Sequence, residues 1–162
     1  MKNALLEKKH SLVEKLGVVI ENRDQLPPVA SRIISYVVLN GKVGTTFDDL
    51  VVNLCASKST ISTHLNHLVD LKQLEYFTKQ GDRKKYYIIS KCHIINHINK
   101  MIDNWNTEKE LHLEMKSYKK EANELIPDHA DKFSLEFHNS YITYLDEVTK
   151  SVLKLIEKIE HN

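Results

Sequence analysis

Apolar and polar positions follow a helical period at the start of the chain. Over residues 3–22, charged side chains occupy one face of the predicted helix and apolar side chains occupy the other. The apolar face consists of Leu5, Leu12, Leu16 and Val19. This pattern predicts an amphipathic helix that ends near Asn22-Arg23-Asp24, with a long apolar stripe that needs a partner surface.

Prolines, a glycine and hydroxyl residues delimit the next helices. Pro28 stands where a proline fits the first turn of a helix, and Asn40-Gly41 is typical of a helix end. Thr46 and Asp49 have the spacing of a capping box, which predicts a short helix there. Its inward-facing residues are expected to be Leu50, Val51 and Leu54. Ser57 is then placed to cap the following helix.

The helix after Ser57 separates apolar from polar residues clearly. Ile61, Leu65 and Leu68 recur at i, i+4 and i+7, so we expect them to face the core. The opposite face then carries uncharged polar residues and a histidine. These are Ser59, Thr63, Asn66 and His67, with Thr60 and Ser62 beside them.

The period changes after Lys72 to that of β-strands. LEYFT and KYYII are short aromatic and β-branched runs, and KQGDRK between them indicates a hairpin with a glycine at its tip. On the returning strand Tyr86 and Tyr87 alternate, so one is expected to face inward and the other to border the loop. Helix, short helix, helix and hairpin is the order of a winged helix-turn-helix domain.

Helical periodicity returns from Lys91 and continues until shortly before Pro127. The last segment has a heptad pattern, which predicts an apolar seam. The seam consists of Tyr141, Leu145, Val148, Val152, Leu155 and Ile159. Together with the first helix, and its Leu5, Leu12 and Leu16, the seam is predicted to form a dimer interface. The predicted organisation is therefore an N-terminal dimerisation helix over residues 1–25, a winged helix over 26–90 and a dimerisation arm over 91–162.

Charge is distributed unevenly along the 162 residues, although the net charge is only +1. Residues 57–100 hold eight Lys or Arg against three Asp or Glu, whereas residues 101–162 hold eight against thirteen. The basic middle, at +5, is suited to an anionic polymer. No run reaches the length of a membrane span, and Glu7 and Glu14 distinguish the start from a signal peptide. We therefore expect a cytoplasmic protein.

The polar helix and the basic hairpin together predict a DNA-binding surface. Small hydroxyl side chains at a helix start permit close approach to phosphates and base edges, and cations on a protruding loop suit the DNA backbone or a narrow minor groove. Asp82 is placed to orient Arg83 or its neighbours. The candidate DNA contacts are Ser57, Lys58, Ser59, Thr60, Thr63, His64, His67, Lys79, Arg83, Lys84 and Lys85.

The runs LPPVASRIISYVVLN and TTFDDLVVNLCASKSTISTHLNHLVDLKQLEYFTKQGDRKKYYIIS resemble the winged-helix transcription regulators of the MarR superfamily, in particular its GbsR-like branch. The resemblance spans residues 26–90 and, more loosely, the flanking helices. It implies a homodimer on a pseudo-palindromic operator, with one recognition helix in each half-site. The Asp-x-Arg pattern of the family's wing is only partly matched by Gly81-Asp82-Arg83, so Arg83 and Lys84 are both candidates for the groove.

The resemblance also implies a repressor that a small-molecule effector releases from DNA. Some members of the branch resemble sensors of quaternary-ammonium osmolytes such as choline, which aromatic side chains bind. The sequence shows no motif for such an aromatic cage. Trp105 and Tyr118 are the aromatic candidates, and core packing is the preferred interpretation of both.

Other kinds of chemistry have little support in the sequence. No nucleophile elbow, phosphate-binding glycine loop or dinucleotide fingerprint occurs, so we expect neither catalysis nor a cofactor. His93 and His97 have a metal-binding spacing but lack a third ligand, and no metal site is predicted. Cys55 and Cys92 lie in apolar runs and are expected to be reduced and buried. The alternative function is that of a winged-helix protein–protein adaptor without DNA binding.

Overall fold

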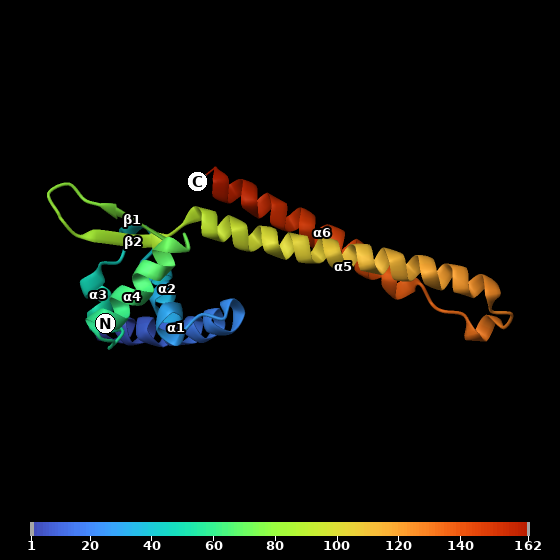
Figure 1. The fold of residues 1–162 in the computed structure, drawn as a ribbon, viewed down its shortest axis with the longest axis horizontal. Helices are drawn as coiled ribbons and strands as arrows, with labels where there is room; N and C mark the ends of the chain where they lie inside the picture. Colours follow the sequence, from blue (N-terminus) through green and yellow to red (C-terminus); the bar gives the residue numbers. More distant parts are fainter. Residues whose placement is uncertain (1, 162) are drawn as a thin grey trace. The chain divides into compact units, whose positions relative to one another are not determined.

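The computed structural model describes residues 2–161, which form a mainly helical chain with one β-hairpin (Figure 1). The elements are α1 (Lys2–Asp24), α2 (Pro28–Asn40), η1 (Gly41–Val43), α3 (Phe47–Asn53), α4 (Lys58–Asp70), β1 (Leu74–Thr78), β2 (Lys85–Ile89), α5 (Lys91–Leu125), η2 (His129–Asp131) and α6 (Glu136–Glu160). The chain divides between Ile94 and Ile95 into two compact units, called here the N-terminal and C-terminal units. The N-terminal unit has the predicted winged-helix order, so the predicted fold class is confirmed.

Local signals set the helix boundaries as the sequence predicts. α2 begins at Pro28, and its C-cap is Gly41, whose φ of 56° suits a residue without a Cβ. Thr46 and Asp49 form the predicted capping box: the Asp49 amide donates to Thr46 Oγ1 at 3.2 Å and the Thr46 amide donates to Asp49 Oδ2 at 2.9 Å. Ser57 Oγ accepts from the Thr60 amide at 3.1 Å and so caps α4.

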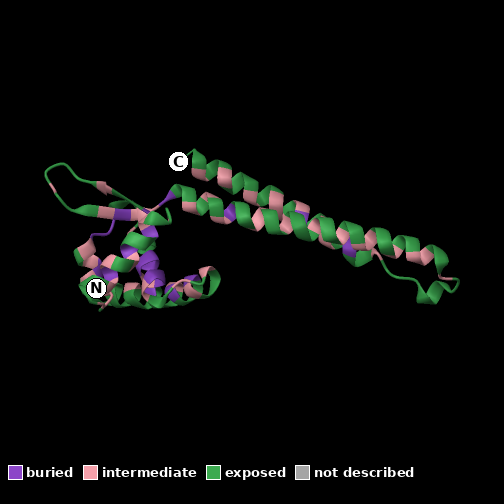
Figure 2. Cartoon of the chain, in the orientation of Figure 1, coloured by how far each residue is buried: buried purple, intermediate pink, exposed green. Residues whose placement is uncertain are grey.

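The core of the N-terminal unit gathers apolar side chains from all its helices and its hairpin (purple in Figure 2). Ile61, Leu65 and Leu68 of α4 are fully buried, as predicted. Their neighbours in this core include Ile33, Val37, Leu50 and Leu74. Burying each such side chain contributes about 1.5–3 kcal/mol, so the core fixes which face of α4 is left exposed.

α1 packs against α2 of its own chain and forms part of this core. Val13 and Ile20 are buried, and Leu16 is packed against the same cluster. Leu5 and Leu12 of the predicted stripe stay exposed, at 70% and 41%. The face toward the core therefore runs through Val13, Leu16 and Ile20, at i, i+3 and i+7, because α2 covers that side of the helix.

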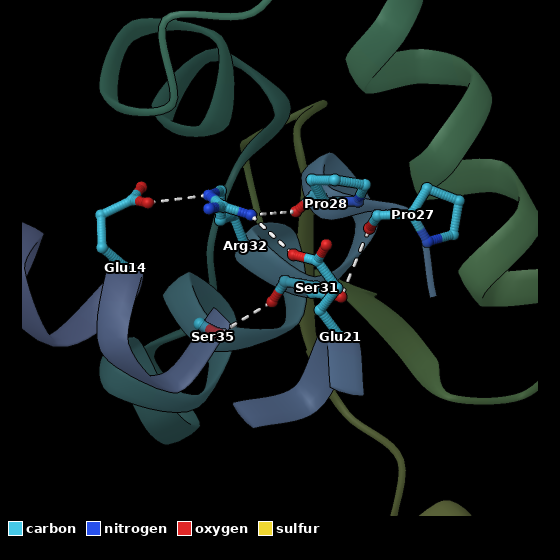
Figure 3. Close-up of polar contacts among 7 residues, drawn as sticks. All are labelled: Glu14, Glu21, Pro27, Pro28, Ser31, Arg32 and Ser35. Atoms are coloured by element: carbon cyan, nitrogen blue, oxygen red, sulfur yellow. Dashed lines mark hydrogen bonds and ion pairs between the residues drawn. The ribbon is translucent and has the colours of Figure 1, made fainter. Parts of the chain in front are cut away.

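Arg32 of α2 ties the two helices together (Figure 3). Its Nε donates to Glu14 Oε2 at 2.9 Å, and one terminal nitrogen lies 3.4 Å from Glu21 Oε2 and 3.0 Å from the Pro28 carbonyl. A Cβ on Gly17 of α1 would lie 3.0 Å from Arg32 Cγ, which explains why a glycine stands there within a helix. A single guanidinium thus bridges two carboxylates that lie about two turns apart on the same face of α1.

The C-terminal unit consists of most of α5, η2 and α6. Lys109 of α5 pairs with Asp146 of α6 at 2.5 Å, and Tyr141 Oη donates to Glu108 Oε2 at 3.1 Å. Leu145, the second residue of the predicted seam, is buried within the unit. Part of the heptad seam therefore serves contacts inside one chain.

A buried histidine lies beside these contacts. His138 Nδ1 is 3.0 Å from His112 Nδ1, and Lys119 Nζ donates to His138 Nε2 at 2.9 Å. Because an ammonium only donates, Nε2 of His138 carries no proton and its Nδ1–H donates to His112. Burial, together with the nearby charge of Lys119, lowers the pKa of His138 below its ordinary value.

The expected burial of the two cysteines is wrong. Cys55 and Cys92 are both free thiols and both exposed. Cys55 lies between α3 and α4 with a φ of 51°, and Cys92 lies in the first turn of α5. An apolar flanking sequence does not fix the direction of a side chain in a turn or at a helix start, and here both point outward.

Candidate nucleic-acid interface

The exposed face of α4 carries the predicted polar residues. Ser59, Thr63, Asn66 and His67 are exposed, whereas Thr60, Ser62 and His64 are half-buried at the edges of this face. The remaining candidates on this element, Ser57 and Lys58, are exposed at its start. All the candidate residues of α4 and its N-cap are therefore at least partly accessible.

Hydroxyl groups at the start of α4 form a connected network. Ser57 Oγ lies 2.9 Å from Ser59 Oγ and 2.8 Å from Thr60 Oγ1. Thr63 Oγ1 donates to the Ser59 carbonyl at 3.0 Å. Three partners use all the hydrogen-bonding capacity of Ser57 Oγ, whereas the hydroxyl oxygens of Ser59, Thr60 and Thr63 can each still accept a further hydrogen bond.

The hairpin forms the predicted wing, with strands paired from Leu74 opposite Ile89 to Thr78 opposite Lys85. The Asp82 amide donates to the Lys79 carbonyl at 3.0 Å and closes a turn in which Gly81 has a φ of 77°. Glycine accepts this positive φ at the third position of a turn. Tyr87 is buried and Tyr86 is half-buried beside the loop, as the alternation predicts.

Asp82 orients the backbone and a tyrosine of the wing. Its Oδ1 accepts from the Lys84 amide at 2.9 Å, and its Oδ2 accepts from Tyr86 Oη at 2.6 Å. The bond from Tyr86 is the main reason that the pKa of Asp82 is lowered, and the same bond raises the pKa of Tyr86. Asp82 thus acts on Lys84 and Tyr86, and the structure records no contact between it and Arg83.

The four wing cations differ in what they contact. Lys79 Nζ lies 3.7 Å from the centroid of the Tyr86 ring, and Lys85 Nζ lies 4.1 Å from that of Tyr76. Lys84 Nζ lies 3.5 Å from Asp48 Oδ2, and both side chains are more than half exposed. Arg83 is exposed and has no hydrogen-bond or ion-pair partner among residues 2–161. Only one of the four cations is therefore paired with a carboxylate in this part of the chain.

A short bridge that the sequence analysis does not predict joins the wing to the segment just before α3. The Thr45 amide donates to the Tyr87 carbonyl at 2.9 Å, and the Tyr87 amide donates to the Thr45 carbonyl at 2.8 Å. Gly44 makes this approach possible, since a Cβ there would lie 2.8 Å from Tyr86 Cβ. The signal for the bridge is the glycine itself, at a φ of 80° and next to a threonine.

The predicted dimer residues fall into two groups. Leu5, Leu12 and Leu155 are exposed, whereas Leu16 and Leu145 pack inside their own units. The half-buried remainder of the seam comprises Tyr141, Val148, Val152 and Ile159. Exposed apolar residues also occur outside the predicted set, among them Leu6, Phe137, Tyr144 and Leu153.

The aromatic candidates for an effector site are not brought together. Tyr118 is 68% exposed, so its expected core packing is wrong: it lies on the outer face of α5. Trp105 is half-buried.

Across the described residues, no three His, Cys, Asp or Glu side chains are grouped as metal ligands would be. None of the helices in the described part of the chain has the length and hydropathy of a membrane span.

Comparison with known proteins supports the fold. A solved structure described as the crystal structure of a transcriptional regulator is similar over 96% of this chain and 99% of its own, with 17% sequence identity and a TM-score of 0.51. No protein-family model and no curated protein sequence matches the chain. The chain is therefore similar in fold, from its N-terminal helix to its C-terminal helix, to a protein of that description.

Proposed function

We propose that this protein is a DNA-binding transcriptional regulator that uses α4 as its recognition helix and the β1–β2 hairpin as its wing. The observation that carries the proposal is the combination of an exposed polar face on α4 with an adjacent wing whose Arg83 has no partner among the described residues. The likeness in fold to a solved transcriptional regulator supports the same function. Binding, without catalysis or a cofactor, is sufficient for this role.

The chemistry of the two elements assigns them different tasks. Serine and threonine hydroxyls hydrogen-bond to any base edge, and the Thr63 methyl group can pack on thymine, so α4 on its own gives modest base discrimination. The wing cations neutralise phosphates and release counterions, which supplies affinity for any sequence. Lys79 and Lys85 are exposed residues whose ammonium groups lie over aromatic rings and have no carboxylate partner among the described residues, so both can also approach phosphate.

The proposed assembly is a homodimer on a pseudo-palindromic operator, as in the MarR superfamily and its GbsR-like branch. Exposed apolar residues such as Leu5, Leu12 and Leu155 provide surface for the partner copy. A dimer contact sets the distance between two recognition helices, which must match the spacing of the half-sites. A small-molecule effector that changes this distance would release the operator, and on this basis we propose a repressor.

The proposal is tested by titrating the protein with its own upstream DNA and with random DNA over a salt series. We expect preferential binding to the upstream DNA and a steep loss of affinity with salt. Arg83→Ala should weaken binding to both DNAs and reduce the logarithmic salt slope by about one, because it removes one phosphate contact. Lys132→Ala, which removes an exposed cation of the C-terminal unit, is the matched control.

Absence of binding to either DNA at low salt would refute this function and favour the protein–protein adaptor. If Arg83→Ala binds DNA with an unchanged salt slope, Arg83 does not contact phosphate, although the protein still binds DNA. Equal affinity for upstream and random DNA at every salt concentration would contradict sequence-specific regulation.

A further inference from the structure

A cleft lined by both polar and apolar side chains lies between α4, the start of α3 and the beginning of β2, all within the N-terminal unit. Ser62 and Asn66 line it from α4, and Lys84 and Lys85 line it from the wing. Asp48 is the acid among its lining residues. The cleft therefore combines neutral hydrogen-bonding side chains, one carboxylate and two lysine side chains, of which Lys84 has its ammonium group beside that carboxylate.

The walls of the cleft are held in fixed positions. Tyr87 and Leu65, which also line it, are buried at 8% and 1% exposure and belong to the core. The paired hydrogen bonds between Thr45 and Tyr87 fix the segment before α3 against β2. Asp48 and Lys84 therefore lie on two segments that these hydrogen bonds join, and the side chains of both residues are exposed.

The contents of the cleft are suited to an anion. Lys84 Nζ lies 3.5 Å from Asp48 Oδ2, so the ammonium already holds one anionic oxygen. Within the described part of the chain, Ser62 Oγ and the Asn66 side-chain amide have no hydrogen-bond partner. A phosphate oxygen offers Lys84 the same kind of acceptor as Asp48 does, and Ser62 and Asn66 supply further donors.

We propose that this cleft seats one backbone phosphate of duplex DNA, and that Asp48 occupies Lys84 in the free protein and is exchanged for that phosphate on binding. The inference rests on the proposed function, and it adds that the wing reaches the groove next to the one that α4 enters. The DNA strand that separates two adjacent grooves must then cross between α4 and the wing, where the cleft lies. Asp48 weakens binding twice, since it competes for Lys84 and repels the phosphate.

The test uses fluorescence anisotropy with a labelled random-sequence duplex over a salt series, because a phosphate contact does not depend on sequence. At low salt Asp48→Asn should tighten binding about two- to five-fold, the range expected for loss of an exposed charge pair. Lys84→Gln should weaken binding and lower the logarithmic salt slope by about one. In the Lys84→Gln background the gain from Asp48→Asn should shrink, because the competition for Lys84 is gone.

Glu7→Gln is the matched control, since it removes the same charge from an exposed position that does not line the cleft. If Asp48→Asn and Glu7→Gln bind the duplex with equal affinity, Asp48 does not compete with phosphate for Lys84. If Lys84→Gln binds the duplex as tightly as the wild type does, with the same logarithmic salt slope, the phosphate site in the cleft is refuted and the proposed function still stands. Failure of the wild type to bind any duplex would overturn the proposed function and the cleft together.

Thermal unfolding checks that both variants are folded. Asp49, which makes the capping box of α3, is retained in Asp48→Asn. Lys84 is exposed on the wing, so its replacement removes no core contact and Lys84→Gln remains informative if Asp48→Asn unfolds.

Discussion

Replacement of Gly44 by alanine should be among the most damaging single changes in the N-terminal unit. Gly44 has a φ of 80° and a ψ of 162°, a region of backbone space that belongs almost wholly to glycine. An added Cβ would lie 2.8 Å from Tyr86 Cβ and 3.2 Å from a ring carbon of Phe77. A Cβ cannot rotate away from such a contact, so either the backbone at Gly44 or the wing must move.

Two costs add in Gly44→Ala. Holding alanine in this backbone region costs about 1–3 kcal/mol, and overpacking against Tyr86 and Phe77 costs about 1–3 kcal/mol more. We therefore expect a loss of about 2–6 kcal/mol in the free energy of unfolding, which is a large part of the 5–15 kcal/mol typical of a domain. Gly81→Ala is the matched control, because Gly81 has a φ of 77° but no atom within 4 Å of its added Cβ. It should cost about 1–2 kcal/mol.

Urea unfolding followed by far-ultraviolet circular dichroism measures the difference between the two variants. Hydrogen exchange locates it, since the amides of Thr45 and Tyr87 should lose protection in Gly44→Ala and keep it in Gly81→Ala. Equal unfolding midpoints for the two variants would refute the steric part of the reasoning. Retained protection at Thr45 and Tyr87 in a destabilised Gly44→Ala would show that the strain is relieved elsewhere.

Three further predictions concern the helices. Arg32→Met should lower the free energy of unfolding by about 1–3 kcal/mol and selectively expose the α1 amides to hydrogen exchange, because two carboxylates lose their shared partner. Leu155→Glu should shift a dimer to monomer in light scattering while the neighbouring exposed Lys154→Glu leaves it dimeric, since Leu155 is 48% exposed. Because the pKa of His138 is lowered in the folded state, the imidazole is protonated in the unfolded chain at a higher pH than in the folded one. The contribution of His138 to the free energy of unfolding is therefore complete above pH 6.5 and is lost as the pH falls through the folded-state pKa. His138→Gln should flatten that dependence in thermal unfolding, whereas His129→Gln, at an exposed site, should retain it.

Features that depend on a few neighbouring residues could be predicted from the sequence. The capping box at Thr46 and the hairpin around Gly81 are local arrangements, and both are present as expected. The buried face of α4 follows from the spacing of Ile61, Leu65 and Leu68, because a helix fixes which residues share a side. These features also determine the exposed polar face, so the candidate residues of α4 could be named in advance.

Features that depend on how elements pack could not be predicted in the same way. On α1 two apolar stripes compete, and only the position of α2 selects the one through Val13 and Ile20 over the one through Leu5 and Leu12. The heptad pattern of α6 likewise does not say whether its partner helix belongs to the same chain, and Leu145 is buried within one chain. The pairing of Lys84 with Asp48 joins positions 36 residues apart in sequence that no local rule relates.

The wing illustrates how such non-local contacts prepare a surface for binding. Its backbone is fixed at the tip by Asp82 and at the base by the bridge between Thr45 and Tyr87. Because the bond from Tyr86 lowers the pKa of Asp82 and Asp82 raises the pKa of Tyr86, neither group changes its charge near neutral pH and the tip contact persists there. A loop that is already ordered loses less conformational entropy on binding than a mobile one. Tyr86→Phe should therefore weaken DNA binding with little change in its salt slope, whereas Arg83→Ala should change both, and this contrast separates the residue that positions the wing from the residue that contacts phosphate.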